Sequence, residues 1–120
     1  RRIEHDFREI QEFMSGFARN YGKPLLISET GMRPIRAQCA APWNYGDIGP
    51  WTPQRYARIY DERMQTRWID GVVKPMLDME DNKGVFWWDY QSDYTVRGRQ
   101  GEERLREVYR PHACRNIDGA

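Results

Sequence analysis

The spacing of apolar residues along the chain predicts two long amphipathic helices. Between residues 3 and 21, apolar side chains recur every three or four positions, which is the period of a helix that buries one face. Gly22 follows, and glycine is the residue type that commonly ends a helix. The same period returns over residues 52–79. Gly71 and Pro75 are expected to kink or break this second helix near its end.

Two short runs rich in apolar and aromatic residues predict strands. Residues 23–29 read Lys-Pro-Leu-Leu-Ile-Ser-Glu. This run is too short for a helix, and its unbroken apolar centre is typical of a parallel strand that is buried on both faces. Residues 84–90 read Gly-Val-Phe-Trp-Trp-Asp-Tyr and are rich in β-forming side chains. A third helix is expected over residues 102–110, ending at Pro111.

This order of elements predicts an α/β fold with parallel strands. The pattern is helix-strand-helix-strand-helix, and strands joined by a helical crossover are parallel. All-parallel sheets need helices on both faces or closure into a barrel. A complete (β/α)8 TIM barrel takes about 250 residues, whereas this chain has 120 and begins inside its first helix. We therefore expect residues 1–120 to form a single partial domain, the C-terminal portion of such a barrel.

An autonomous small α/β domain is the weaker alternative, because two strands alone would leave unpaired edges that favour aggregation.

The composition of the chain excludes two classes of partner. Lys and Arg total 19 against 18 for Asp and Glu, a net charge of +1, and the basic residues do not form the stripe that nucleic-acid binders carry. No apolar run reaches the roughly 18 residues of a membrane span. We expect neither a nucleic-acid nor a membrane partner.

The metal-binding residue types are sparse and badly spaced. Cys39 and Cys114 form no Cys-x-x-Cys motif and have no histidine at the spacing of a zinc site. They are interpreted as two independent thiols, with a disulfide between them as the alternative. We therefore expect no metal and no cofactor.

Glu29 is the first candidate for chemistry. It ends the first predicted strand, and α/β enzymes place their sites at the C-terminal ends of parallel strands. A carboxylate there can act as a nucleophile, a general base or a metal ligand. The alternative is a glutamate that only starts the following loop. That loop, residues 30–51, is long enough to be functional or disordered, and its aromatic residues favour function.

The strand sequences resemble those of a known clan of enzymes. Residues 23–31, Lys-Pro-Leu-Leu-Ile-Ser-Glu-Thr-Gly, resemble the seventh strand of clan A glycoside hydrolases, a pattern that ends in the catalytic nucleophile. Residues 84–90 look like the eighth strand of the same barrels, whose terminal Trp lies under the sugar. Pro-Trp-Asn-Tyr at 42–45 and the helix residues 54–60 are similar to glycoside hydrolase family 113, mannan-degrading enzymes and their relatives. The resemblance covers roughly residues 5–111.

This resemblance implies a retaining glycoside hydrolase that acts on a β-linked polysaccharide or oligosaccharide, with mannan as a candidate substrate. Glu29 would be the nucleophile and Trp88 the platform beneath the reacting sugar, because sugar rings pack their C–H faces on aromatic planes. Strand alternation directs Trp87 and Trp88 to opposite faces. Asp89 is expected to hydrogen-bond the substrate or a neighbouring side chain. Three loop residues are further candidates for substrate binding, with plain loop packing as the alternative: Trp43, Asn44 and Tyr45.

A retaining mechanism also needs a second carboxylate, about 5 to 5.5 Å from the first. The clan supplies this general acid from an Asn-Glu pair at the end of the fourth strand, and the sequence contains neither that pair nor that strand. The expected partners are a carbohydrate and the missing N-terminal part of the barrel, and the chain alone is expected to be poorly soluble and inactive. The alternative is a non-catalytic glycan-binding or structural barrel module, for example in a phage-tail-like assembly.

Overall fold

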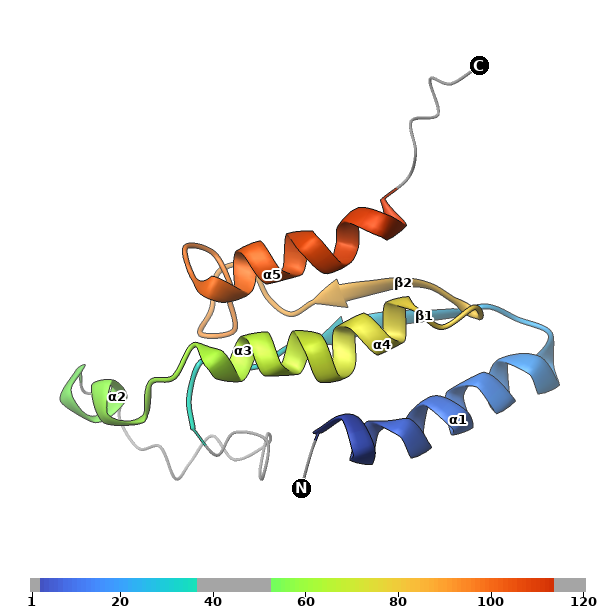
Figure 1. The fold of residues 1–120 in the computed structure, drawn as a ribbon, viewed down its shortest axis with the longest axis horizontal. Coiled ribbons are helices and arrows are strands. Elements are labelled where there is room, and N and C mark those ends of the chain that lie inside the picture. Colours follow the sequence, from blue (N-terminus) through green and yellow to red (C-terminus); the bar gives the residue numbers. More distant parts are fainter. Residues whose placement is uncertain (1–2, 37–52, 114–120) are drawn as a thin grey trace, which may run out of the picture.

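A computed structural model describes residues 3–36 and 53–113 of the chain. The elements, in chain order, are α1 (Ile3–Tyr21), β1 (Leu25–Thr30), α2 (Pro53–Ile59), α3 (Arg63–Trp68), a π-helical stretch (Ile69–Val73), α4 (Lys74–Leu77), β2 (Asn82–Trp87), α5 (Gln100–Tyr109) and a 3₁₀ turn (Arg110–His112). The predicted alternation of helices and strands is confirmed, and the chain has an α/β fold (Figure 1).

The two strands pair in parallel, as the sequence predicts. Three pairs of residues set the register: Leu25 with Asn82, Ile27 with Val85, and Thr30 with Trp87. Between the last two pairs, β1 advances by three residues and β2 by two. The end of β1 therefore carries one extra residue, an irregularity of the kind that re-aims side chains at the end of a strand.

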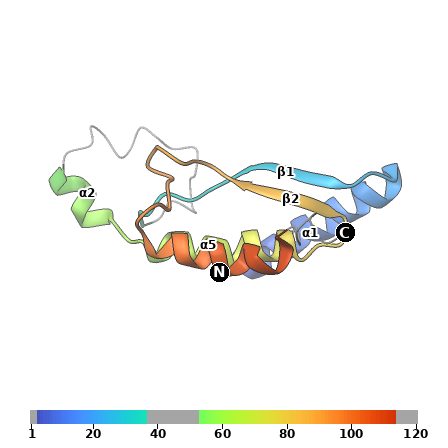
Figure 2. The ribbon, with the colours of Figure 1, turned by 90° about the horizontal axis from the view of Figure 1, so that it is seen from above.

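The helices cover one face of this sheet. Figure 2 shows the two strands as one layer, with α1, α4 and α5 forming a second layer beneath them. The hydrophobic core lies between these layers. Its buried members come from helices and from β2: Phe7, Ile69, Val72, Val73, Met76, Val85 and Val108. Ile27 and Trp87 pack against this cluster from the strands, so the inward residues of both strands meet the helices.

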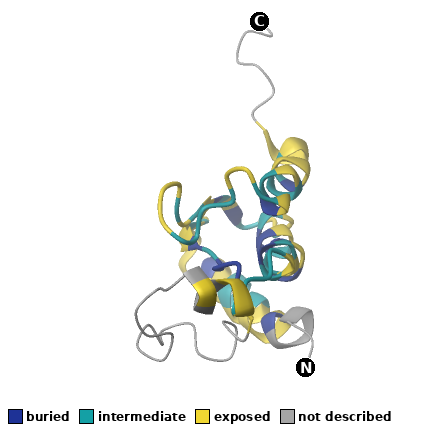
Figure 3. Ribbon diagram, turned by 90° about the vertical axis from the view of Figure 1, so that its left-hand side faces the viewer, coloured by how far each residue is buried: buried dark blue, intermediate teal, exposed yellow. Residues whose placement is uncertain are grey.

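The other face of the sheet is open among the described residues. Leu26 is 60% exposed, Phe86 is 58% exposed and Trp88, just beyond β2, is 48% exposed. In Figure 3, the buried segments gather where the helices face the strands. The expected burial on both faces is therefore not met among the described residues, because they contain only one layer of helices.

The second predicted helix is interrupted earlier than its sequence suggests. Between α2 and α3 the backbone leaves the helix and pairs with the segment that follows β1. Tyr60 forms an antiparallel bridge with Ile35, and the N–H of Asp61 donates to the carbonyl of Pro34 at 2.7 Å. Apolar periodicity continues across this break, so the pattern alone did not reveal it.

The expected break near the end of the helix is milder than predicted. Gly71 lies within the π-helical stretch, and Pro75 lies in α4, which follows that stretch without a gap. The helical path therefore runs through both residues. β2 begins and ends earlier than residues 84–90, and α5 begins two residues before the predicted start.

Helix α1 packs by one side only. Phe7 and Ala18 are buried, and the Gln11 side chain donates to the carbonyl of Pro75 at 3.0 Å. A second row of large apolar side chains is about half exposed or more: Ile10, Phe13, Phe17 and Tyr21. Within the described residues, no helix is both long enough and apolar enough to cross a membrane.

Candidate functional site

The C-terminal ends of the two strands are in direct backbone contact. The N–H of Trp88 donates to the carbonyl of Thr30 at 2.7 Å. A Cβ atom on Gly31 would lie 2.0 Å from the carbonyl oxygen of Trp88, which is far inside van der Waals contact. Because that neighbour is backbone and cannot swing away, only glycine fits at this position. The contact brings the residues that follow Glu29 against Trp88.

Glu29 lies at the C-terminal end of a parallel strand, as predicted. It is the last residue but one of β1, and its side chain is exposed. Ser28 beside it is exposed as well, because the extra residue in β1 breaks the alternation that would turn one of them inward. No described residue forms a hydrogen bond or an ion pair with the Glu29 carboxylate. Among the described residues, neither of its oxygens is occupied, and the side chain is exposed.

The two tryptophans at the end of β2 point to opposite sides, which confirms the prediction from strand alternation. Trp87 is half-buried and packs against the core, and its indole N–H donates to the carbonyl of Tyr94 at 2.8 Å. Trp88 is on the open side with half of its surface exposed. An exposed indole offers a flat apolar plane at the same end of the sheet as Glu29.

Asp89 holds the turn that follows β2. The peptide bond between Trp88 and Asp89 is cis. One carboxylate oxygen of Asp89 accepts from the backbone N–H groups of Ser92 at 2.7 Å and Gln91 at 3.1 Å. Hydrogen bonding by the Ser92 backbone and side chain, followed by that of Gln91, lowers the pKa of Asp89 below its ordinary value. This aspartate is ionised at neutral pH, so it is unsuited to donate a proton as a general acid.

A buried glutamine, which the sequence analysis did not single out, ties the two strand-end loops together. The Gln65 side chain is fully buried, and its amide nitrogen lies within hydrogen-bond distance of three carbonyl oxygens. They belong to Met32, after β1, and to Tyr94 and Thr95, after β2, at 3.0, 3.1 and 3.0 Å. The sequence does carry a signal for it. Gln65 precedes Ile69 by four residues and so lies on the buried face of its helix, where a polar residue needs partners.

A second positioning contact anchors the end of β1 itself. Thr30 is buried, and its hydroxyl oxygen accepts from the indole N–H of Trp68 at 3.0 Å. Since Trp68 belongs to α3, this contact fixes the strand end to the helix layer. Nothing in the sequence pattern pairs these two residues, which are 38 positions apart.

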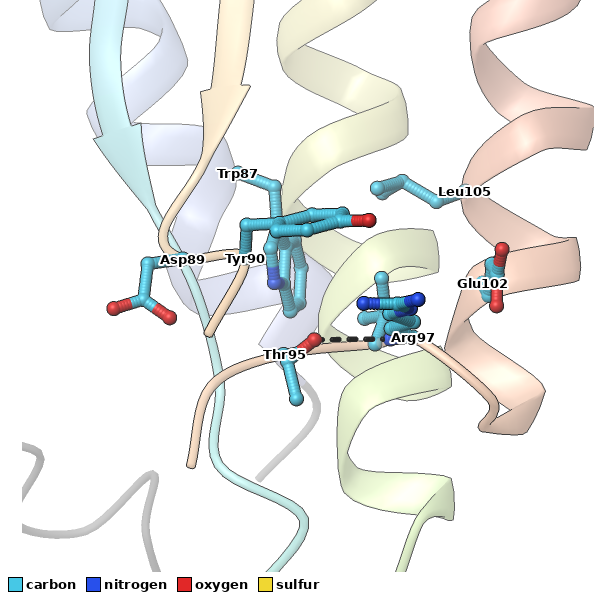
Figure 4. Close-up of a pocket in the computed structure, with 8 residues that line it drawn as sticks. Trp87, Asp89, Tyr90, Thr95, Arg97, Glu102 and Leu105 are labelled. Carbon is cyan, nitrogen blue, oxygen red and sulfur yellow. Dashed lines mark hydrogen bonds between the residues drawn. The ribbon is translucent and has the colours of Figure 1, made fainter. Parts of the chain in front are cut away.

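A pocket of about 200 Å³ lies beside the strand ends, between the end of β2 and α5 (Figure 4). Its walls come from β2, the following loop and α5: Trp87, Asp89, Tyr90, Thr95, Val96, Arg97, Glu102 and Leu105. Trp88 is not among them. The pocket is therefore lined by Trp87, which packs toward the helices, and not by Trp88 on the open face.

Several predicted residues lie outside the described part of the chain: Trp43, Asn44, Tyr45, Cys39 and Cys114. Within residues 3–36 and 53–113, no three His, Cys, Asp or Glu side chains gather in a way that could hold a metal ion. No protein-family model, curated protein or solved structure matches this chain. The similarity to clan A glycoside hydrolases therefore stays a resemblance of motifs.

Proposed function

We propose that this chain is the C-terminal part of a (β/α)8-barrel glycoside hydrolase that cleaves a β-linked polysaccharide or oligosaccharide with retention. Glu29 acts as the nucleophile, and Trp88 supports the reacting sugar. The observation that carries this proposal is the strand-end geometry. An exposed carboxylate without a partner among the described residues and a half-exposed indole stand at the same end of two parallel strands, whose backbones are in contact.

The packing of the chain favours a larger barrel around it. The open sheet face carries Leu26 and Phe86, and apolar side chains of this size on a strand are usually covered. Both outer edges of the two-stranded sheet lack a described strand. The exposed apolar row of α1 lies on the helix that leads into β1. A preceding strand and helix would cover this row and pair with the free edge of β1.

The proposed reaction has two steps. Glu29 attacks the anomeric carbon, the glycosidic bond breaks, and the leaving-group oxygen takes a proton from a general acid. This forms a glycosyl ester on Glu29. Water then attacks the same carbon after giving a proton to the conjugate base of that acid, and the carboxylate of Glu29 is released. The two inversions leave the product with retained configuration.

The general acid must be supplied by the upstream part of the barrel. Asp89 is near the strand ends, but its lowered pKa and its two backbone N–H partners suit a carboxylate that stays ionised. In this proposal, Asp89 keeps the turn after Trp88 in place. The proton donor comes from another strand, as the resemblance implies.

Covalent trapping tests the proposal on the full-length polypeptide. We expect a 2-deoxy-2-fluoro glycoside from a panel of β-mannosides, β-glucosides and β-galactosides to label Glu29, because such reagents accumulate the glycosyl ester. Mass spectrometry of the labelled peptide identifies the residue. Glu29→Gln should abolish labelling and lower kcat by on the order of 10³-fold or more, since it removes the nucleophile.

Glu12→Gln is the matched control, because Glu12 is an exposed glutamate on α1, away from the strand ends. It should leave labelling and kcat unchanged. Labelling of a different carboxylate, or full activity of Glu29→Gln, would overturn the role of Glu29. If no sugar labels the protein but it still binds polysaccharide, the chain belongs to a non-catalytic barrel module.

A further inference from the structure

The pocket between β2 and α5 has an apolar floor and a charged mouth. The partly buried Trp87, Val96 and Leu105 supply the floor, and the exposed Tyr90 and Arg97 stand at the opening. Figure 4 shows Trp87, Tyr90, Arg97 and Leu105 around the pocket. The guanidinium carbon of Arg97 lies 5.4 Å from the centre of the Tyr90 ring, which is within the range of a cation–π contact. The pocket thus combines a hydrophobic interior with one cation at its rim.

The acidic groups around the pocket are already engaged. The Glu102 carboxylate accepts from the N–H of Gly98 and from the Arg106 guanidinium, both at 2.7 Å. Asp89 accepts from the backbone of its own turn, and its carboxylate points away from the other pocket residues in Figure 4. Neither acid pairs with Arg97.

The donors at the mouth remain available among the described residues. The side chain of Arg97 forms no ion pair or hydrogen bond with any of them, and neither does the hydroxyl group of Tyr90. A guanidinium presents a fork of N–H groups that matches the two oxygens of a carboxylate. A single cation close to the charge of Glu102 suits a monoanion better than a dianion.

We propose that this pocket binds a small carboxylic acid with a flat apolar body, in the form of its carboxylate. The body lies on Trp87 and Leu105, and the carboxylate pairs with Arg97 at the mouth, where the Tyr90 hydroxyl can donate as well. The size agrees with this assignment, because apolar cavities of about 150 Å³ accommodate benzene. The site is separate from the proposed sugar platform, and it does not depend on glycosidase activity.

Phenylacetate and its uncharged analogue phenylacetamide test the assignment on the full-length polypeptide. The indole N–H of Trp87 provides a nuclear magnetic resonance signal inside the pocket. We expect phenylacetate to shift this signal with saturation and to bind about tenfold more tightly than phenylacetamide, because only the acid pairs with a cation. Arg97→Gln should weaken the binding of phenylacetate about tenfold and leave the binding of phenylacetamide unchanged.

Two further variants keep the result interpretable. Arg67→Gln removes the same charge from an exposed arginine of α3 outside the pocket, and it should bind phenylacetate like the unmodified protein. Tyr90→Ala removes an exposed ring at the mouth, with little expected effect on folding, and should weaken both compounds. Equal affinity for the two compounds, an unchanged affinity in Arg97→Gln, or no saturable shift of the Trp87 signal would each overturn the proposal.

Discussion

The two faces of the β1–β2 sheet carry similar apolar residues but meet different surroundings. On the helix-covered face, Ile27, Val85 and Trp87 pack against the core. On the open face, Leu26 and Phe86 keep more than half of their surface exposed. Alternation along each strand separates the two sets, yet both sets are apolar. Strands with apolar residues on both sides are typical of sheets that are covered on both faces.

The contrast shows that the apolar side chains of the open face are left largely uncovered by the described residues. At the C-terminal end of the strands, a carboxylate, Glu29, is exposed together with the indole of Trp88. An exposed carboxylate and an exposed indole at the strand ends are the arrangement expected where the end of a barrel opens on a site. The predictions below test this difference between the faces.

Phe86→Ala should have the largest effect, in the full-length polypeptide. If further strands cover the open face, the substitution removes a buried ring and lowers the free energy of unfolding by about 4 kcal/mol. Val85→Ala, its neighbour on the covered face, should cost about 2 kcal/mol in either case, because Val85 is buried already. Urea unfolding of both variants measures the two costs.

These two losses of stability together show whether the open face is covered in the full-length polypeptide. A loss below about 1 kcal/mol for Phe86→Ala, with the expected loss for Val85→Ala, would mean that the open face stays exposed and that the barrel proposal is wrong. Equal and small losses in both would contradict the packing of β2 on the helices.

Gly31→Ala should lower the free energy of unfolding by about 3 kcal/mol, because the new methyl group would overlap the backbone carbonyl of Trp88. Gly16→Ala is the matched control. A Cβ at Gly16 meets no heavy atom within 4 Å, and the residue lies inside α1, so alanine should be neutral or stabilising by up to about 1 kcal/mol. Thermal unfolding of both variants gives the comparison. An unaffected Gly31→Ala protein would contradict the close contact between the strand ends.

The smallest effect concerns the turn after Trp88 and its response to acid. The folded protein lowers the pKa of Asp89 below its ordinary value of 3.8, mainly through hydrogen bonding by Ser92. The stabilisation is therefore complete above pH 3.8 and is lost as the pH falls through the lower folded pKa. A carboxyl titration followed by nuclear magnetic resonance should place the Asp89 midpoint below 3.8.

The backbone signal of Ser92 should follow the same midpoint, because its N–H donates to that carboxylate. Asp89→Asn keeps an oxygen acceptor but cannot ionise, so it should remove this part of the pH response. A midpoint at or above the ordinary value would show that the carboxylate does not hold the turn.

The features that could be predicted are local ones. Apolar periods located α1, both strands and α5 to within a few residues, and the alternation at Trp87 and Trp88 gave their opposite orientations. The break between α2 and α3 could not be predicted, because it depends on a backbone bridge between Tyr60 and Ile35 that the apolar period does not encode. The parallel pairing followed from the crossover, but the extra residue near Glu29 did not.

In the candidate site, too, some features could be predicted from the sequence and others could not. Glu29 was chosen from its position at the end of a strand, whereas Trp88 was chosen over Trp87 only by the resemblance to clan A glycoside hydrolases. Their support could not be predicted, because Gln65, Thr30 and Gly31 act through contacts between segments that are far apart in the chain. The sequence by itself determined which residues lie at the strand ends, since strand periodicity is a short-range property. Only the tertiary structure decided how those ends are held together, because backbone contacts and buried hydrogen bonds depend on the packing of the whole chain.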